Sequence, residues 1–97
     1  MEFNFELRED RVVALDGETQ AGESIFEDGA ENTLIITGTY VEDEYRGEGL
    51  AEQLTDQVVA YAKEQDKKIQ QAGCSYVVSL FDRKADKYED IKVDKIN

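Results

Sequence analysis

A glycine-rich turn between an expected strand and an expected helix has the clearest chemical potential in this sequence. The turn carries Arg46, Gly47 and Gly49, and a periodic apolar pattern begins at Leu50. Backbone N–H groups at a helix N-terminus have no partner within the helix, and the helix dipole adds a partial positive charge there. Glycine lets the backbone approach a phosphate closely, and an arginine adds charge-assisted hydrogen bonds. This turn therefore predicts a site for a diphosphate group.

A plain strand–turn–helix connection is the alternative interpretation of the same residues, because two loop glycines alone are weak evidence for a ligand. The turn is not a P-loop, since no Gly-Lys-Ser or Gly-Lys-Thr follows it. It is also a poor dinucleotide-binding fingerprint, because the glycine pattern is incomplete and the preceding strands are expected to pair antiparallel. The residues of the turn alone leave both interpretations open.

Cys74 is the only thiol in the chain and the second candidate for chemistry. It lies between a short expected strand and an expected helix, and a helix N-terminus favours the thiolate form. Such a thiolate can attack a carbonyl carbon as a covalent nucleophile, and the thiol can instead give a proton to a leaving group. A small buried hydrophobic residue is the alternative, because free cysteine is among the most buried residue types.

Histidine, the commonest general base, is absent from the sequence. Glu42, Asp43 and Glu44 are carboxylates that would have to take a proton instead, and a carboxylate is a poor base unless it is buried. Solvated turn residues are the alternative for all three. Tyr40 and Tyr76 are candidate proton donors, although tyrosines at these spacings more often belong to a core.

Alternating apolar and polar residues predict strands in the first half of the chain. Asp16-Gly17 predicts a hairpin turn, because glycine accepts the positive φ that such turns need. The expected strands cover residues 2–8, 11–15, 18–26 and 33–41. The last of them is rich in β-branched and aromatic residues, whereas the third has few apolar ones. The pattern is an antiparallel meander that leads into the glycine-rich turn.

The apolar period changes after the turn. Residues at the spacing of one helix face are Leu50, Leu54, Val58 and Tyr61. We expect this helix to end near Gln65-Asp66, followed by a short strand at residues 69–72 and a second, shorter helix within residues 74–86. Residues 88–97 form a final strand or a frayed end. The order predicts a single α+β domain of residues 1–97, a mainly antiparallel sheet with its helices on one or both faces.

Composition limits the classes of function. The 97 residues include 23 acidic and 11 basic side chains, and the net charge of -12 argues against a nucleic-acid binder. Polyamines and basic peptides fit this acidic field as substrates, with plain solubility as the alternative. No apolar run is long enough to cross a membrane, and from the first residues we expect no signal peptide. Because a single cysteine cannot form an internal disulfide, we expect a cytoplasmic protein.

Four segments occur in the order and at about the spacing of a known family. They are Thr39-Tyr40-Val41, Glu44-Tyr45-Arg46-Gly47-Glu48-Gly49-Leu50-Ala51, Cys74-Ser75-Tyr76-Val77 and Lys87-Tyr88-Glu89-Asp90. Together they resemble the small single-domain members of the GNAT superfamily of N-acetyltransferases, over about residues 3–93. The pattern Arg46-Gly47-x-Gly49-x-Ala51 is similar to the pyrophosphate-binding signature of that superfamily. The resemblance implies the acyl-CoA N-acyltransferase fold.

The resemblance also implies acetyl-coenzyme A as co-substrate and no bound metal. The backbone at Tyr40 and Val41 would pair with the pantetheine arm like an added strand. Backbone N–H groups would hold the diphosphate at Arg46, Gly47, Glu48, Gly49, Leu50 and Ala51. The other side of the cleft would be residues 74–83, and Arg83 or Lys84 would reach a phosphate of coenzyme A.

Three hypotheses about function follow. The first is an acetyl-coenzyme A-dependent N-acetyltransferase that acts on an unidentified amine, either directly or with Cys74 as a catalytic residue. The second is a module that binds coenzyme A without catalysis, because the family usually has a histidine at the position of Gly38. The third is a small acidic interaction protein without a ligand. We expect a monomer or a weak dimer.

Overall fold

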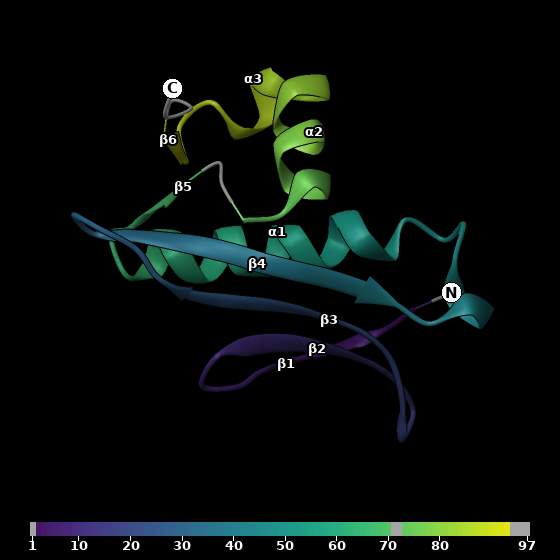
Figure 1. The fold of residues 1–97 in the computed structure, drawn as a ribbon. Coiled ribbons are helices and arrows are strands. Elements are labelled where there is room, and N and C mark those ends of the chain that lie inside the picture. The colour runs from purple at the N-terminus through teal and green to yellow at the C-terminus, as the bar shows by residue number, and fades with distance from the viewer. Residues whose placement is uncertain (1, 71–72, 94–97) are drawn as a thin grey trace.

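Four strands run back and forth before the chain enters its longest helix (Figure 1). The computed structural model describes residues 2–70 and 73–93. Its elements are β1 (Asn4–Leu7), β2 (Arg11–Asp16), β3 (Thr19–Asp28), β4 (Thr33–Val41), the 3-10 turn η1 (Asp43–Tyr45), α1 (Leu50–Glu64), β5 (Lys68–Gln70), α2 (Ser75–Arg83), α3 (Ala85–Tyr88) and β6 (Lys92–Val93).

All six strands belong to one sheet in the order β1-β2-β3-β4-β5-β6. The first four strands pair antiparallel, which confirms the predicted meander. The expected third strand is also present, and it extends two residues beyond its predicted end. It pairs with β2 on one side and with β4 on the other. β5 and β6 join in parallel, and a parallel neighbour requires a crossover connection. The helix α1 is the crossover between β4 and β5.

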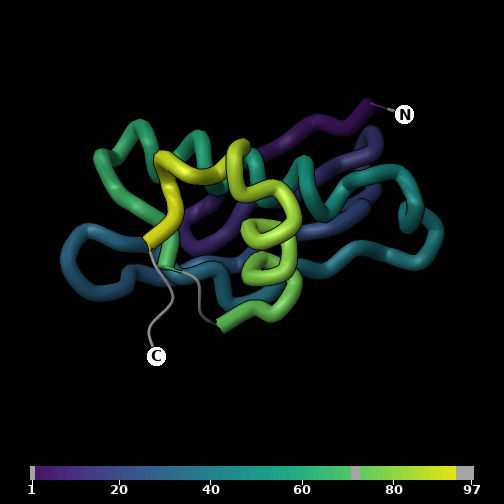
Figure 2. Tube along the Cα trace, turned by 90° about the horizontal axis from the view of Figure 1, so that it is seen from above, coloured from purple at the N-terminus to yellow at the C-terminus, as the bar shows by residue number. Residues whose placement is uncertain are grey.

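The helix α1 packs along one face of the sheet, as Figures 1 and 2 both show. Its predicted apolar stripe is confirmed, because Leu50, Leu54 and Val58 are buried. Opposite them, the sheet contributes buried side chains such as Leu34 and Ile36 of β4. In the described part of the chain, no helix lies along the other face of β1–β4 (Figures 1 and 2). The described helices also include none that is long and apolar enough to cross a membrane.

The second half of the fold differs from the prediction in one respect. One helix was expected within residues 74–86, whereas the chain forms α2 and α3 with a break at Lys84, whose φ and ψ are -123° and 47°. The break turns the chain so that Tyr88 stacks on Phe81, with ring centroids 4.6 Å apart. Both rings are buried, so a contact between two short helices outweighs the continuation of one.

The last strands are short. The strand expected at residues 69–72 is β5 at Lys68–Gln70, and positions 71–72 lie outside the described residues. The described part of the chain ends in the two-residue strand β6, and residues 94–97 of the expected element lie outside the described range.

Candidate active site

A cleft of about 470 Å³ opens where the C-terminal end of β4 meets the start of α1. It is lined by Thr39, Tyr40, Val41, Tyr45, Arg46, Gly47, Gly49, Leu50, Ala51, Glu52 and Tyr76. Seven of the eight residues that the sequence proposed for cofactor binding are in this lining, and Glu48 is the exception. The glycine-rich turn, the end of β4 and α2 therefore face one common space.

The glycine-rich turn depends on positive φ angles at two residues. Gly47 has a φ of +85° and Gly49 a φ of +75°, and Gly49 is the residue immediately before α1. A Cβ atom at either position would meet nothing within 4 Å, so neither glycine is required by packing. Glycine is favoured here because other residues rarely adopt this conformation, and the free space above it leaves the backbone accessible.

A buried tyrosine holds the turn in place. Tyr45 in η1 is only 7% exposed, and its hydroxyl donates a hydrogen bond of 2.8 Å to Asp16 at the end of β2. This bond is the main reason that the pKa of Tyr45 is raised. The ring of Phe3 packs against Tyr45 edge-on at 5.8 Å. The turn before α1 is therefore attached to β2 and to the residue immediately before β1.

Arg46 extends from this turn into solvent. Its side chain is 71% exposed and pairs with Asp43, 3.2 Å away. Such an exposed pair contributes little to stability, so Arg46 can turn towards a bound anion at low cost. Glu42 and Glu44 are exposed as well, which agrees with solvated turn residues and gives no carboxylate of this turn the burial that a general base would need.

The edge of β4 is open beside the cleft. β5 pairs with β4 only at Thr33, Leu34 and Ile35, so no described strand covers that edge over residues 36–41. A β-bulge adds to the local irregularity, because Ile25 pairs with Gly38 while Phe26 pairs with Ile36. Unpaired backbone groups along a strand edge are suited to bind an extended ligand as an added strand.

The charge balance at the start of α1 was not apparent from the sequence. Glu52 lies on the first turn of α1 and accepts hydrogen bonds from Lys84 at 2.8 Å and from Lys87 at 2.7 Å. The hydrogen bond from Lys84 is the largest cause, and that from Lys87 the second, of a lowered pKa for Glu52. Two lysines thus neutralise the carboxylate of Glu52 at the cleft wall. The charge around the cleft is therefore more favourable to an anionic ligand than the net charge of the whole protein suggests.

Cys74 lies at the inner end of this region. It is the residue immediately before α2, as predicted, and its side chain is half-buried. Its Sγ is 4.0 Å from Oγ1 of Thr39, which lines the cleft and lies 3.4 Å from the hydroxyl of the buried Ser24. The thiol itself does not line the cleft. Its contact with Thr39 places it next to the cleft wall.

The sequence of residues 4–91 matches the family described as GCN5-related N-acetyl-transferase. The chain belongs to the GCN5-related N-acetyltransferase family. Its six-stranded mixed sheet with helix α1 as the crossover is the α+β fold of that family. The predicted family and fold class are therefore confirmed. A comparison of this chain with curated proteins finds no match.

Three solved structures are similar to this N-acetyltransferase family member. One, described as a GCN5-like N-acetyltransferase from Staphylococcus aureus, has 26% identity and a TM-score of 0.75, with 97% of this chain and 90% of that chain covered. A second, described as a streptothricin acetyltransferase from Bacillus anthracis in complex with acetyl coenzyme A, has 23% identity and a TM-score of 0.56. The match covers 64% of this chain and 37% of that chain. A further GNAT family structure from Staphylococcus aureus has 20% identity and a TM-score of 0.55, covering 64% of this chain and 55% of that chain.

Several cleft residues of this family member escaped the site predicted from sequence. Thr39, Tyr45 and Glu52 line the cleft but were not proposed as site residues. Glu52 had one recognisable signal, since it lies directly after the glycine-rich signature in the first helical turn. The lysine partners of Glu52 had none, because they lie 32 and 35 residues further along the chain. Arg83 contacts Ser79 on its own helix at 3.4 Å and also interacts with Tyr76 of the cleft lining.

Proposed function

We propose that this protein transfers an acetyl group from acetyl-coenzyme A to an amine, with the acetyl donor bound in the cleft. The observation that carries the proposal is the position of the open edge of β4 directly before the glycine-rich start of α1. One end of this surface suits an extended chain with amide groups, and the other suits a diphosphate. Acetyl-coenzyme A combines both groups in one molecule.

The proposed pose follows the order of these two surfaces. The diphosphate binds the backbone N–H groups from Arg46 to Ala51, including that of Glu48, and Arg46 adds a charge-assisted hydrogen bond. The pantetheine arm pairs with the backbone of Tyr40 and Val41. Lys84 and Lys87 are held close to the cleft wall by Glu52, where their charge attracts a phosphate. The thioester end then extends along β4, away from the turn.

We propose a cationic amine as the acceptor and the cytoplasm as the location. The net charge of -12 attracts cations, and exposed Glu42, Asp43 and Glu44 lie between β4 and the glycine-rich turn. Cys74 is the proposed catalytic thiol, since it lies immediately before α2 with its sulfur 4.0 Å from Oγ1 of Thr39 in the cleft wall. It would take the acetyl group or assist its direct transfer.

Calorimetric titration with coenzyme A and acetyl-coenzyme A tests the cleft, with Gly49→Glu as the disruptive variant. A glutamate at this αL position blocks the approach of the diphosphate and repels it, so we expect affinity to fall at least about 100-fold. Gly17→Glu is the matched control, because Gly17 also has a positive φ of +62°, also has no atom within 4 Å of a built Cβ and lies outside the cleft.

Each outcome of the titration has a clear meaning. Micromolar binding that is lost in Gly49→Glu and kept in Gly17→Glu supports the assigned cleft. Binding without release of thiol in the presence of amines would indicate a coenzyme A-binding module. An absence of binding at millimolar ligand would reject both and leave a small acidic interaction protein.

A further inference from the structure

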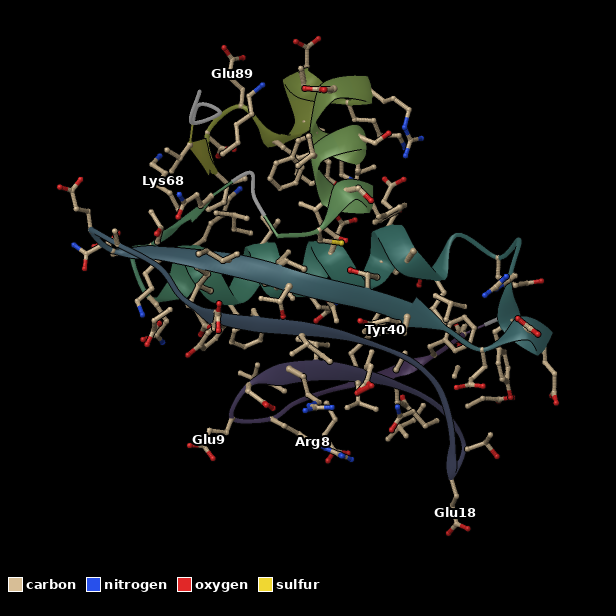
Figure 3. All side chains as sticks on the ribbon, viewed as in Figure 1. Arg8, Glu9, Glu18, Tyr40, Lys68 and Glu89 are labelled. Carbon is tan, nitrogen blue, oxygen red and sulfur yellow. The ribbon has the colours of Figure 1, made fainter. Side chains whose placement is uncertain are left out.

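Tyr40 has an unusual position on β4 (Figure 3). Its side chain is 59% exposed, yet the ring lies back along its own strand towards Gly38. A Cβ atom built on Gly38 would be 2.6 Å from the Tyr40 hydroxyl oxygen and 2.7 and 2.8 Å from two ring carbons. The absence of a side chain at position 38 is therefore what allows Tyr40 to occupy this place.

The hydroxyl of Tyr40 is also uncommitted. Three tyrosines line the cleft. Tyr45 donates its hydroxyl hydrogen to Asp16, and Tyr76 interacts with Arg83. The hydroxyl of Tyr40 makes no hydrogen bond within the described residues. Since the chain has no histidine, the free hydroxyl of this cleft-lining residue is a candidate to move a proton.

The level of this hydroxyl along β4 matches the proposed direction of the acetyl donor. With the diphosphate at the start of α1 and the pantetheine beside Val41 and Tyr40, the thioester reaches the level of Thr39 and Gly38. The Cys74 thiol contacts Thr39 at this same level. The Tyr40 ring therefore ends at the level along β4 that the thioester would reach, on the opposite face of the sheet from the contact between Thr39 and Cys74.

We infer that Tyr40 is a catalytic residue whose hydroxyl moves the proton during acetyl transfer, and that Gly38 is a positioning residue that makes room for its ring. This inference rests on the proposed function. The amine nitrogen forms a bond to the carbonyl carbon, and the bond between that carbon and the coenzyme A sulfur breaks. The hydroxyl gives its proton to the departing thiolate, and the phenolate takes the proton that the nitrogen loses. One hydroxyl can serve both atoms, because nitrogen and sulfur are bonded to the same tetrahedral carbon.

The test measures thiol release from acetyl-coenzyme A with spermidine and with poly-L-lysine as acceptors. We expect Tyr40→Phe to lower kcat about 100-fold, the lower range for a general acid or base, with the affinity for coenzyme A unchanged. Gly38→Ala should have a similar effect, because its Cβ displaces only the far end of a flexible side chain. In the double variant the losses should not add, since both changes remove the same group.

Tyr61→Phe is the matched control, because it removes a tyrosine hydroxyl on α1 outside the cleft and should leave kcat unchanged. An active wild type with an equally active Tyr40→Phe variant would overturn the inference and leave the proposed function intact. Additive losses in the double variant would overturn the positioning role of Gly38. A wild type that binds coenzyme A but releases no thiol with either amine would overturn the transfer activity, and this inference with it.

Discussion

Cys74 and Thr39 bring a thiol and a hydroxyl together beside the cleft, with 4.0 Å between sulfur and oxygen. Local sequence does not predict this contact, because the two residues are 35 positions apart in the chain. The contact allows two different roles for the thiol, a covalent acetyl carrier and a group that assists direct transfer.

Cys74→Ala separates these roles from a purely structural one. We expect the variant to fold and to bind coenzyme A normally, because alanine fits the half-buried site, while turnover falls at least about tenfold. Radiolabelled acetyl-coenzyme A without an amine then shows whether the wild type retains a label that Cys74→Ala lacks. Full turnover in Cys74→Ala would exclude the proposed catalytic thiol.

The two glycines of the turn are predictable from sequence, because their meaning depends only on their neighbours. A strand before them and a helix after them suffice to indicate an anion site. The position of Tyr40 against Gly38 is not predictable in this way. It depends on the β-bulge between β3 and β4, which changes the face on which successive residues lie.

The contact between α1 and α3 joins the two halves of the chain. The hydroxyl of buried Tyr88 donates a 2.6 Å hydrogen bond to Asp56, and Lys87 pairs with the same carboxylate at 3.0 Å. Burial, and then the bond to Asp56, raise the pKa of Tyr88. The folded state therefore holds the Tyr88 proton more tightly than the unfolded state does. The resulting stabilisation is complete below the pKa of Tyr88 in the unfolded state, and it declines as pH rises from there through the pKa in the folded state.

Tyr88→Phe tests this contact. Phenylalanine keeps the stacking on Phe81 and removes one hydrogen bond to a charged group, so we expect the free energy of unfolding at pH 7 to fall by about 1–2 kcal/mol. Above about pH 10, the ordinary value for tyrosine, the wild type should lose stability more steeply than the variant. Tyr45 contributes the same trend to both proteins. Urea unfolding at pH 7 and near pH 10.5 measures the effect, and parallel pH curves would contradict it.

Periodicity predicted β4 and α1 well, since both are long and have one strongly apolar face. It failed at the boundary between α2 and α3. The break at Lys84 brings Lys84 and Lys87 to Glu52 and places Tyr88 on Phe81. These contacts join distant parts of the chain, so a pattern within one segment contains no trace of them. The two-residue β6 is too short to carry a periodic signal of its own.

The protein as a whole carries far more negative than positive charge. Its 23 acidic residues exceed the 11 basic ones, and basic side chains such as Arg11, Lys67 and Lys87 are already engaged in ion pairs. The excess carboxylates therefore repel one another in the folded state, where they are closest together. The surface pairs offset little of this repulsion.

Salt should therefore stabilise the protein. Raising sodium chloride from about 20 mM to about 500 mM shortens the Debye length to a few ångströms and screens the repulsion. We expect the stability to rise by about 1 kcal/mol, which corresponds to an increase in Tm of roughly 4–8 °C for a chain of this size. Thermal unfolding followed by circular dichroism measures the change. A decrease in Tm with salt would mean that the ion pairs contribute more than the repulsion costs.

The open edge of β4 also affects how the free protein behaves in concentrated solution. An uncovered strand edge is a place where sheets of different molecules join, and aggregation begins at such edges. The backbone at Tyr40 and Val41, proposed to pair with the acetyl donor, is equally available to a second copy of the chain. The acidic run at residues 42–44 follows directly, where like charges act as gatekeepers against such pairing. The donor would thus serve as a solubilising cap as well as a reagent.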